Sequence, residues 1–192
     1  NKYVASASWD GTAKIWDVIS GKLLFNLEHD NMNHVQSVYF NVNNQKILTS
    51  SDDNTFKIWS GINGKLICTF LGVDSTDYFT QILTGYYQCS PNAAKLLHYV
   101  TKDLKVITFE QLDVKYNRPD KVLEALGNTD TALINSYRKA YQKRIKKLGI
   151  DTTQFKDGYS VPESDFINRD AIEYEQTKDK LTLKIKAVDS IA

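Results

Sequence analysis

The chain has 192 residues, and its 24 lysines and arginines nearly balance its 23 aspartates and glutamates. This balance excludes a chain-wide charge bias toward nucleic acid or anionic membranes, so binding of either kind would have to be local. The longest apolar runs are only a few residues, far below the ~20 that a membrane-spanning helix needs, and we expect no membrane span.

The sequence repeats itself near its start. Residues 3–27, placed over residues 46–70 at an offset of 43, match at ten positions: Ser8/Ser51, Asp10/Asp53, Thr12/Thr55, Lys14/Lys57, Ile15/Ile58, Trp16/Trp59, Ile19/Ile62, Gly21/Gly64, Lys22/Lys65 and Leu23/Leu66. A period of this length with several short β-like runs per unit is typical of four-stranded β-propeller blades. We therefore expect a mainly β fold that opens with two blades.

Each repeat contains a polar turn followed by a strand that ends on tryptophan. The turns are residues 8–12 and 51–55, where Gly11 and Asn54 tolerate the positive φ angle of a tight hairpin. The indole N–H groups of Trp16 and Trp59 each need an acceptor if they are buried. The two units are therefore predicted to hold their tryptophans in the same way.

The shared pattern S-x-D-[GN]-T-x-K-I-W resembles the WD40 repeat, whose blades join a histidine, a serine or threonine, an aspartate and a tryptophan in one hydrogen-bonded network. The resemblance implies a structural, non-catalytic network of these residues: Ser8, Asp10 and Trp16 in the first blade, and Ser51, Asp53 and Trp59 in the second. For the histidine we favour His29, although it lies two positions further from Val35 than the family's common spacing. His34 is the alternative, and we place it on a loop at the rim.

WD40 proteins usually bind partners at the rim where the inner strands and their turns emerge. This resemblance implies Trp9, Asp52 at the equivalent place in the next repeat, and His34 as partner-binding residues. Trp9 is the strongest candidate, because tryptophan is the residue type most enriched among interface hot spots. The alternative is that Trp9 packs on a neighbouring loop of its own blade.

Residues 78–112 are predicted to form a third, degenerate and last blade. Residues 78–83 and 86–89 indicate a hairpin, and residues 96–100 and 104–109 flank a turn at 101–103. Phe109 follows Asp103 at the spacing of Trp59 from Asp53, but a phenyl ring cannot donate the hydrogen bond. Closed propellers need about four to eight blades, so we expect further blades outside this sequence and take residues 1–112 as a partial propeller.

The period then changes to that of helices. Pro119 and Asp120 indicate the start of a short helix that Gly127 ends. A longer helix is predicted from Thr131 to Leu148 by an apolar stripe, and residues 113–149 form a helical extension that must dock on another element. The longer helix carries six basic residues in ten without an acid: Arg138, Lys139, Lys143, Arg144, Lys146 and Lys147. Such a helix can bind nucleic acid, but we favour a solvated or acid-docked face.

The last part of the chain shows two different patterns. Residues 150–176 have little periodicity and are predicted to be an extended linker. Residues 181–187 alternate apolar and polar side chains, which indicates one half-buried strand without a partner strand in the chain. We therefore interpret residues 177–192 as the first strand of a further, truncated β domain, or as a strand that pairs with another chain.

A second resemblance covers residues 78–192, which look like the tail of bacterial WD40 proteins whose propeller precedes a caspase-like peptidase domain. It is carried by these stretches: Gly85-Tyr86-Tyr87, Ser90-Pro91, the Asn117-Arg118-Pro119-Asp120 helix entry, residues 137–141 and residues 181–187. The resemblance implies that a β domain begins near Leu181 and that a protease domain follows it. The chain would then position or regulate that domain.

Cys68 and Cys89 lie at no metal-ligand spacing, so we expect reduced, buried thiols and a reducing, cytoplasmic location. Cys89 and His98 are the candidate pair for a cysteine-dependent hydrolase, the rival hypothesis, but they lack the usual sequence contexts. The chain contains no Gly-rich phosphate loop, HExxH or CxxC motif. We therefore predict a non-catalytic protein-protein interaction scaffold without cofactor or metal, whose partners are other proteins or further domains of the same protein.

Overall fold

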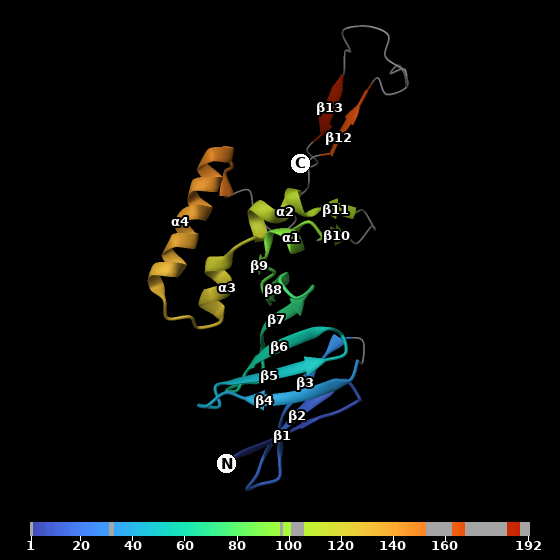
Figure 1. Cartoon of the computed structure of the whole chain (residues 1–192), viewed down its shortest axis with the longest axis vertical. Coiled ribbons are helices and arrows are strands. Elements are labelled where there is room, and N and C mark those ends of the chain that lie inside the picture. Colours follow the sequence, from blue (N-terminus) through green and yellow to red (C-terminus); the bar gives the residue numbers. More distant parts are fainter. Residues whose placement is uncertain are drawn as a thin grey trace. The chain divides into compact units, whose positions relative to one another are not determined.

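The computed structural model describes residues 2–30, 33–96, 98–100, 106–152, 163–167 and 184–188. The chain divides into two compact units, Asn1–Leu148 and Gly149–Ala192. The larger unit begins with β-strands and ends with helices, as the change from blue to orange along the ribbon shows (Figure 1).

Two antiparallel sheets make up the β part. The first contains β1 (Tyr3–Ala7), β2 (Thr12–Asp17) and β3 (Leu23–Glu28) in that order. The second contains, also in chain order, β4 (Val35–Phe40), β5 (Lys46–Ser51), β6 (Thr55–Ser60), β7 (Leu66–Gly72), β8 (Tyr78–Ile82) and β9 (Tyr87–Cys89). The mainly β fold of open, propeller-like sheets followed by helices confirms the predicted fold class.

The 43-residue repeat is also a repeat of backbone geometry. In β2 the register shifts between Ile15 and Trp16, and in β6 it shifts between the equivalent Ile58 and Trp59. Gly11 (φ 84°) and Asn54 (φ 63°) both have the positive φ angle predicted for the hairpin turns. The same sequence pattern therefore builds the same strand, bulge and turn twice.

The two sheets pack face to face around one core. Alternate residues of β2 point into it, and the buried members come from both sheets: Ala13, Ile15 and Leu27 from the first, and Val35, Ile47 and Trp59 from the second. Burial of a side chain such as Ile15, Leu27 or Ile47 stabilises the fold by about 1.5–3 kcal/mol, so this interface holds the two sheets together.

The opposite face of the second sheet packs against a helix. Val122 of α3 (Pro119–Ala125) contacts a cluster that contains Cys68 of β7 and Ile82 of β8. Lys46 Nζ at the start of β5 donates a hydrogen bond to the carbonyl of Leu126, the C-cap of α3. Because Val122 is only 1% exposed, α3 is an integral part of the packing rather than a surface appendage.

Residues 78–112 do not form the separate third blade that was predicted. β8 pairs with β7, with Cys68 opposite Ile82, so the hairpin of β8 and β9 extends the second sheet. The five-residue connection 73–77 allows this, because a short loop favours pairing of the strands it joins. Next come α1 (Pro91–Ala94), the paired strands β10 (His98–Val100) and β11 (Val106–Thr108), and α2 (Phe109–Tyr116). Phe109 therefore begins a helix instead of replacing the tryptophan, and Asp103 lies outside the described residues.

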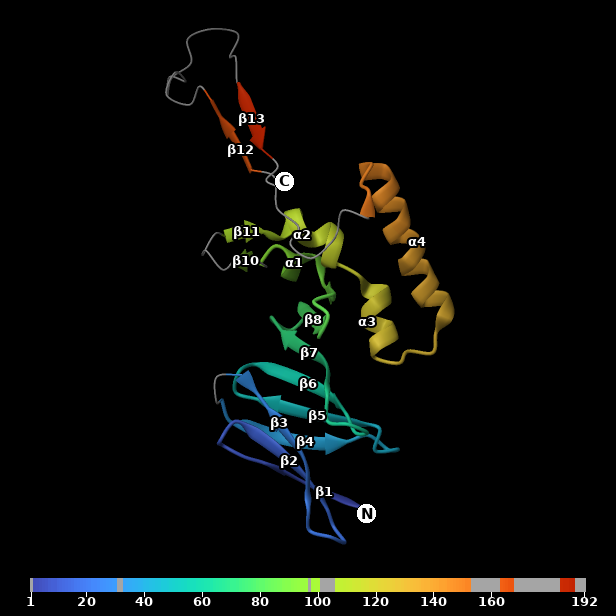
Figure 2. The ribbon, with the colours of Figure 1, turned by 180° about the vertical axis from the view of Figure 1, so that it is seen from behind.

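The predicted helices are present at their predicted positions. α3 and α4 (Thr131–Leu148) lie side by side in both views of the ribbon (Figures 1 and 2). Gly127 and Gly149 follow them with φ angles of 69° and 65°, the left-handed conformation that commonly ends a helix.

The second unit contains a strand pair that the sequence pattern did not reveal. β12 (Glu163–Phe166) pairs antiparallel with β13 (Ile185–Val188), with Glu163 opposite Val188. The prediction of a strand without a partner is therefore wrong, and its partner lies in the stretch predicted to be a linker. Leu181 and Leu183, on which that strand prediction rested, lie outside the described residues.

Candidate partner-binding surface

A buried hydrogen-bonded chain joins the end of the first sheet to the second. His29 Nδ1 lies 3.0 Å from Asp53 Oδ2, and His29 Nε2 lies 2.7 Å from Thr49 Oγ1. Trp59 Nε1 donates to the same Thr49 Oγ1 at 2.8 Å. The structure thus brings together three predicted network residues, His29, Asp53 and Trp59. Both ring nitrogens of His29, the Asp53 carboxylate and the Trp59 indole N–H have hydrogen-bond partners.

The hydroxyl in this chain comes from Thr49 and not from the predicted Ser51. Ser51 lies at the end of β5, where its Oγ accepts a hydrogen bond from the backbone N–H of the second residue along, at 3.3 Å. The first sheet repeats the arrangement, because Trp16 Nε1 donates to Ser6 Oγ at 3.4 Å while Ser8 Oγ accepts a turn N–H. In each sheet the bonding hydroxyl lies two residues earlier than predicted, on the same face of the strand.

The two network aspartates fasten the hairpin turns. Asp53 accepts hydrogen bonds from the N–H and the hydroxyl of Thr55, at 2.8 and 2.6 Å. Burial alone would raise the pKa of Asp53, but the hydrogen bonds from Thr55 and His29 outweigh it and lower that pKa. Hydrogen bonds from Thr12 and Lys14 likewise hold the pKa of Asp10 well below its usual range. Both carboxylates remain ionised, and their hydrogen bonds stabilise the two hairpin turns.

Further bonds hold the loops of both sheets at one end of the β part. The backbone N–H of Val35, which begins β4, donates to the carbonyl of Ser8 in the first hairpin at 3.0 Å. Lys57, whose side chain is 4% exposed, reaches Asp30 Oδ2 at 2.6 Å. These contacts place the turns at residues 8–11 and 52–54 beside the loop that joins the sheets.

Trp9, His34 and Asp52, the three predicted rim residues, meet on this end. The rings of Trp9 and His34 stack with centroids 5.0 Å apart and planes 12° apart, and Trp9 remains 75% exposed. His34 Nδ1 lies 3.4 Å from Asp52 Oδ2, and Gln36 Nε2 donates to the same carboxylate at 2.9 Å. We call these four residues the Trp9 surface. The ring on which Trp9 stacks belongs to the loop between the sheets.

Gln36 is the member of the Trp9 surface that sequence reasoning missed. It lies two residues after His34, in the first strand of the second sheet. The signal that could have found it is the alternation of β4, because buried Val35 must leave its neighbour Gln36 pointing away from the core.

The basic residues of α4 divide into two groups. Arg144 donates to Asp113 Oδ2 at 2.8 Å, and Arg138 is hydrogen-bonded to Glu124, so both arginines dock the helix. The other four predicted basic residues are exposed along one side of the helix: Lys139, Lys143, Lys146 and Lys147. The face is therefore in part acid-docked and in part solvated.

The Asn117–Asp120 motif fastens the helices to the second sheet. Arg118 donates two hydrogen bonds to the Asp120 carboxylate, at 2.8 and 2.7 Å. Its guanidinium lies 4.0 Å from the ring centroid of Tyr141 in α4. Asn117 forms a bridge with Tyr87 of β9, the edge strand. Burial would raise the pKa of Asp120, but Arg118 outweighs burial and lowers it. The motif is thus a structural clasp between β9, α3 and α4.

The Cys89 and His98 pair lacks the geometry of a catalytic dyad. Burial, with the nearby charge of Asp113, raises the pKa of Cys89 to about 11, which opposes thiolate formation. His98 Nδ1 instead lies 3.2 Å from the carbonyl of Leu96. No hydrogen bond joins Cys89 to His98 among the described residues.

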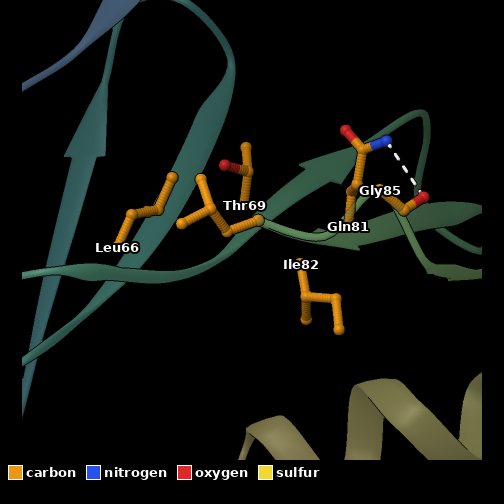
Figure 3. Close-up of a pocket in the computed structure, with 6 residues that line it drawn as sticks. Leu66, Thr69, Gln81, Ile82 and Gly85 are labelled. Carbon is orange, nitrogen blue, oxygen red and sulfur yellow. Dashed lines mark hydrogen bonds between the residues drawn. The ribbon is translucent and has the colours of Figure 1, made fainter. Parts of the chain in front are cut away.

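Other kinds of site find little support in the described residues. Nowhere among them do three or more histidine, cysteine, aspartate or glutamate side chains form a group that could hold a metal. The helices there are too short or too polar to span a membrane. A surface pocket of about 210 Å³ between β7 and the β8–β9 turn is lined by Leu66, Thr69, Gln81, Ile82, Leu83 and Gly85 (Figure 3). This is smaller than a typical small-molecule site of ~300–1,000 Å³.

The geometry defines a repeated β-sheet unit whose tryptophan donates to a hydroxyl two residues before the turn serine, and in the second unit His29 is hydrogen-bonded to the same hydroxyl. Residues 1–17 and 21–60 match the family model "WD domain, G-beta repeat". These residues contain both tryptophan motifs, so this part of the chain is similar to WD40 repeats.

Two solved structures are similar to part of the chain. The WD40 β-propeller domain of Doa1 is 30% identical over 46% of this chain and 32% of that chain, with a TM-score of 0.31. The computationally designed protein Ika8 is 19% identical over 46% of this chain and 30% of that chain, with a TM-score of 0.32. The chain thus spans about a third of the length of each structure. No curated protein matches it.

Proposed function

We propose that this chain is a non-catalytic protein-interaction scaffold and that the Trp9 surface is where a protein partner docks. The observation that carries the proposal is the stacked Trp9–His34 pair, which leaves the indole 75% exposed. Large aromatic side chains at interfaces contribute most of the binding free energy, typically about 2 kcal/mol or more each.

The contacts that hold Trp9 in place favour its use as a docking residue. His34 is held by Asp52, and Asp52 is held by Gln36. A side chain that is already fixed loses little conformational entropy when a partner covers it, which favours affinity. The WD40 repeats on which the surface is built serve in general as platforms for protein interactions.

The helical extension has a second part in this proposal. α3 and α4 are fastened to the second sheet through Arg118 and Asp120, so a domain attached after them would be joined to the repeats through helices that belong to the same compact unit. On the sequence resemblance, that domain would be a caspase-like peptidase of a bacterial protein, which the scaffold positions or regulates. A reducing compartment such as the cytoplasm suits the two free thiols. A reading frame that continues past Ala192 without a peptidase domain would contradict this part.

Site-specific photo-crosslinking tests the docking surface. A photoreactive phenylalanine analogue is placed at position 9 of the full-length protein in its native cells, and adducts are identified by mass spectrometry. Val42 is the matched control, because it is fully exposed in the turn after β4, at the opposite end of that strand from His34.

We expect a discrete protein adduct from position 9 and none from position 42. Equal adducts from both positions, or none from position 9 in a folded protein, would contradict the proposal.

A further inference from the structure

The charge around Trp9 indicates what kind of side chain the surface receives. The described loop residues at this end, 8–11, 29–30, 33–34, 52–54 and 73–77, contain six aspartates and no lysine or arginine: Asp10, Asp30, Asp52, Asp53, Asp74 and Asp77. Lysines from the strands neutralise two of them, through Lys14–Asp10 and Lys57–Asp30. A negative potential therefore remains beside the exposed indole.

Asp52 is the carboxylate best placed to act with Trp9. Its side chain is 48% exposed, and it lies against His34, on which the indole is stacked. Its partners in the described part of the chain are His34 and Gln36, neither of which is a lysine or arginine. The Asp52 carboxylate can therefore form an ion pair with a cationic group of a partner.

The indole favours the same kind of group. The face of an aromatic ring carries partial negative charge and attracts cations, with tryptophan the strongest of the three aromatic residues. One face of Trp9 rests on His34, and most of the remaining surface is open. An anionic ligand would be repelled by Asp52 and by the other loop aspartates, whereas a cation would gain from both features.

We propose that the Trp9 surface binds a lysine or arginine side chain of a protein partner, stacked on the open face of Trp9 and paired with Asp52. This inference rests on the proposed docking function and adds the chemistry of the docked group. Arginine is expected to bind better than lysine, because its planar guanidinium can stack on the ring and reach the carboxylate at once.

The test uses three peptides that differ at one position and NMR of the ¹⁵N-labelled protein. The peptides are acetyl-Gly-Ser-X-Ser-Gly-amide with X as arginine, its uncharged isostere citrulline, or glutamate. The readout is the indole N–H signal of Trp9, assigned by its loss in Trp9→Phe, while the buried Trp59 signal reports that the fold is intact. Asp52→Asn removes the carboxylate charge, and Asp17→Asn, at the far end of β2, is the matched control.

We expect the arginine peptide to shift the Trp9 signal saturably, with a Kd in the millimolar range. The citrulline peptide should bind at least about 3-fold more weakly, since a cation–π contact at an exposed site corresponds to that factor. Asp52→Asn should weaken arginine binding about 2- to 5-fold, and Asp17→Asn should not.

Equal binding of the citrulline or glutamate peptide, or no shift of the Trp9 signal by the arginine peptide at ~10 mM, would overturn the inference. The two proposals fail separately. A crosslink from position 9 without arginine preference removes only the cationic nature of the docked group, whereas loss of that crosslink removes the docking function.

Discussion

His29, in the loop after the first sheet, is hydrogen-bonded to Thr49 in the second sheet, with 2.7 Å between Nε2 and Oγ1. Thr49 Oγ1 also accepts a hydrogen bond from the indole N–H of Trp59. One hydroxyl therefore bonds both the histidine that follows the first sheet and the buried tryptophan of the second. The same end of the sheets carries the Trp9 surface, so the buried bonds also fix the loops that present it.

The first prediction concerns which hydroxyl matters. Thr49→Val keeps the shape of a fully buried side chain but leaves Trp59 and His29 without their shared partner. We expect the free energy of unfolding, measured with urea, to fall by about 2–4 kcal/mol, since each unpaired buried polar group costs about 1–3 kcal/mol. Ser51→Ala, at the strand end, should cost under about 1 kcal/mol. Equal losses in the two variants would contradict the assignment of Thr49.

The sequence predicted the correct face of β5 for the bonding hydroxyl, but not the correct residue on that face. Asp53, Trp59 and His29 follow from the repeat and from the family resemblance, but Thr49 and Ser51 point to the same side of β5, so alternation cannot separate them. Their distances from His29 depend on how the two sheets pack, which is a tertiary property.

The sequence also did not predict which strands pair with one another. The hairpin of β8 and β9 was predicted from its own pattern, but the pattern does not say that β8 joins β7 instead of starting a new sheet. For the same reason β12 was overlooked and β13 was left without a partner. The helix α4, by contrast, was predicted at its observed bounds, because an apolar stripe and a terminating Gly149 are local signals.

The second prediction is a pH dependence that comes from Asp120. Its pKa is lowered in the folded protein, so the unfolded chain binds the proton more tightly. The stabilisation is complete above the ordinary carboxyl pKa of about 3.9 and is lost as the pH falls through the lower folded value. Asp120→Asn should cost about 3 kcal/mol at neutral pH, because it leaves the charge of Arg118 without a partner.

Urea unfolding measured between pH 2 and pH 7 checks this. The variant should lose stability less steeply than the wild type below about pH 4, while Asp53 supplies part of the remaining slope. Acid limbs of equal steepness in the two proteins would contradict the stabilising role of Asp120.

The third prediction concerns the docking of α3. Val122 is 1% exposed against Cys68 and Ile82, so Val122→Ala should lower the free energy of unfolding by about 1–3 kcal/mol. Lys121→Ala, one residue earlier on the solvent side, should change it by less than about 0.5 kcal/mol. Hydrogen exchange of the α3 amides should accelerate in the first variant alone. Unchanged exchange in Val122→Ala would show that α3 is not held by this contact.

The fourth prediction separates the scaffold from the hydrolase hypothesis. The pKa of Cys89 is raised to about 11 by burial, so little thiolate exists near neutral pH. Compared with the urea-unfolded chain, native Cys89 should react with iodoacetamide about 100-fold more slowly, as expected for a pKa two units above that of an exposed thiol. Rapid labelling of the native protein, abolished by His98→Ala, would instead support an activated cysteine.

The most direct test of the Trp9 surface is the affinity for the partner that position 9 crosslinks, measured for wild type and Trp9→Ala. We predict that Kd rises at least about 30-fold, the factor that corresponds to about 2 kcal/mol at a hot spot. Replacing the four exposed lysines of α4 with glutamine should leave Kd unchanged. An unchanged Kd for Trp9→Ala, together with a loss of binding in the lysine variant, would contradict docking at Trp9 and move the docking site to the helix.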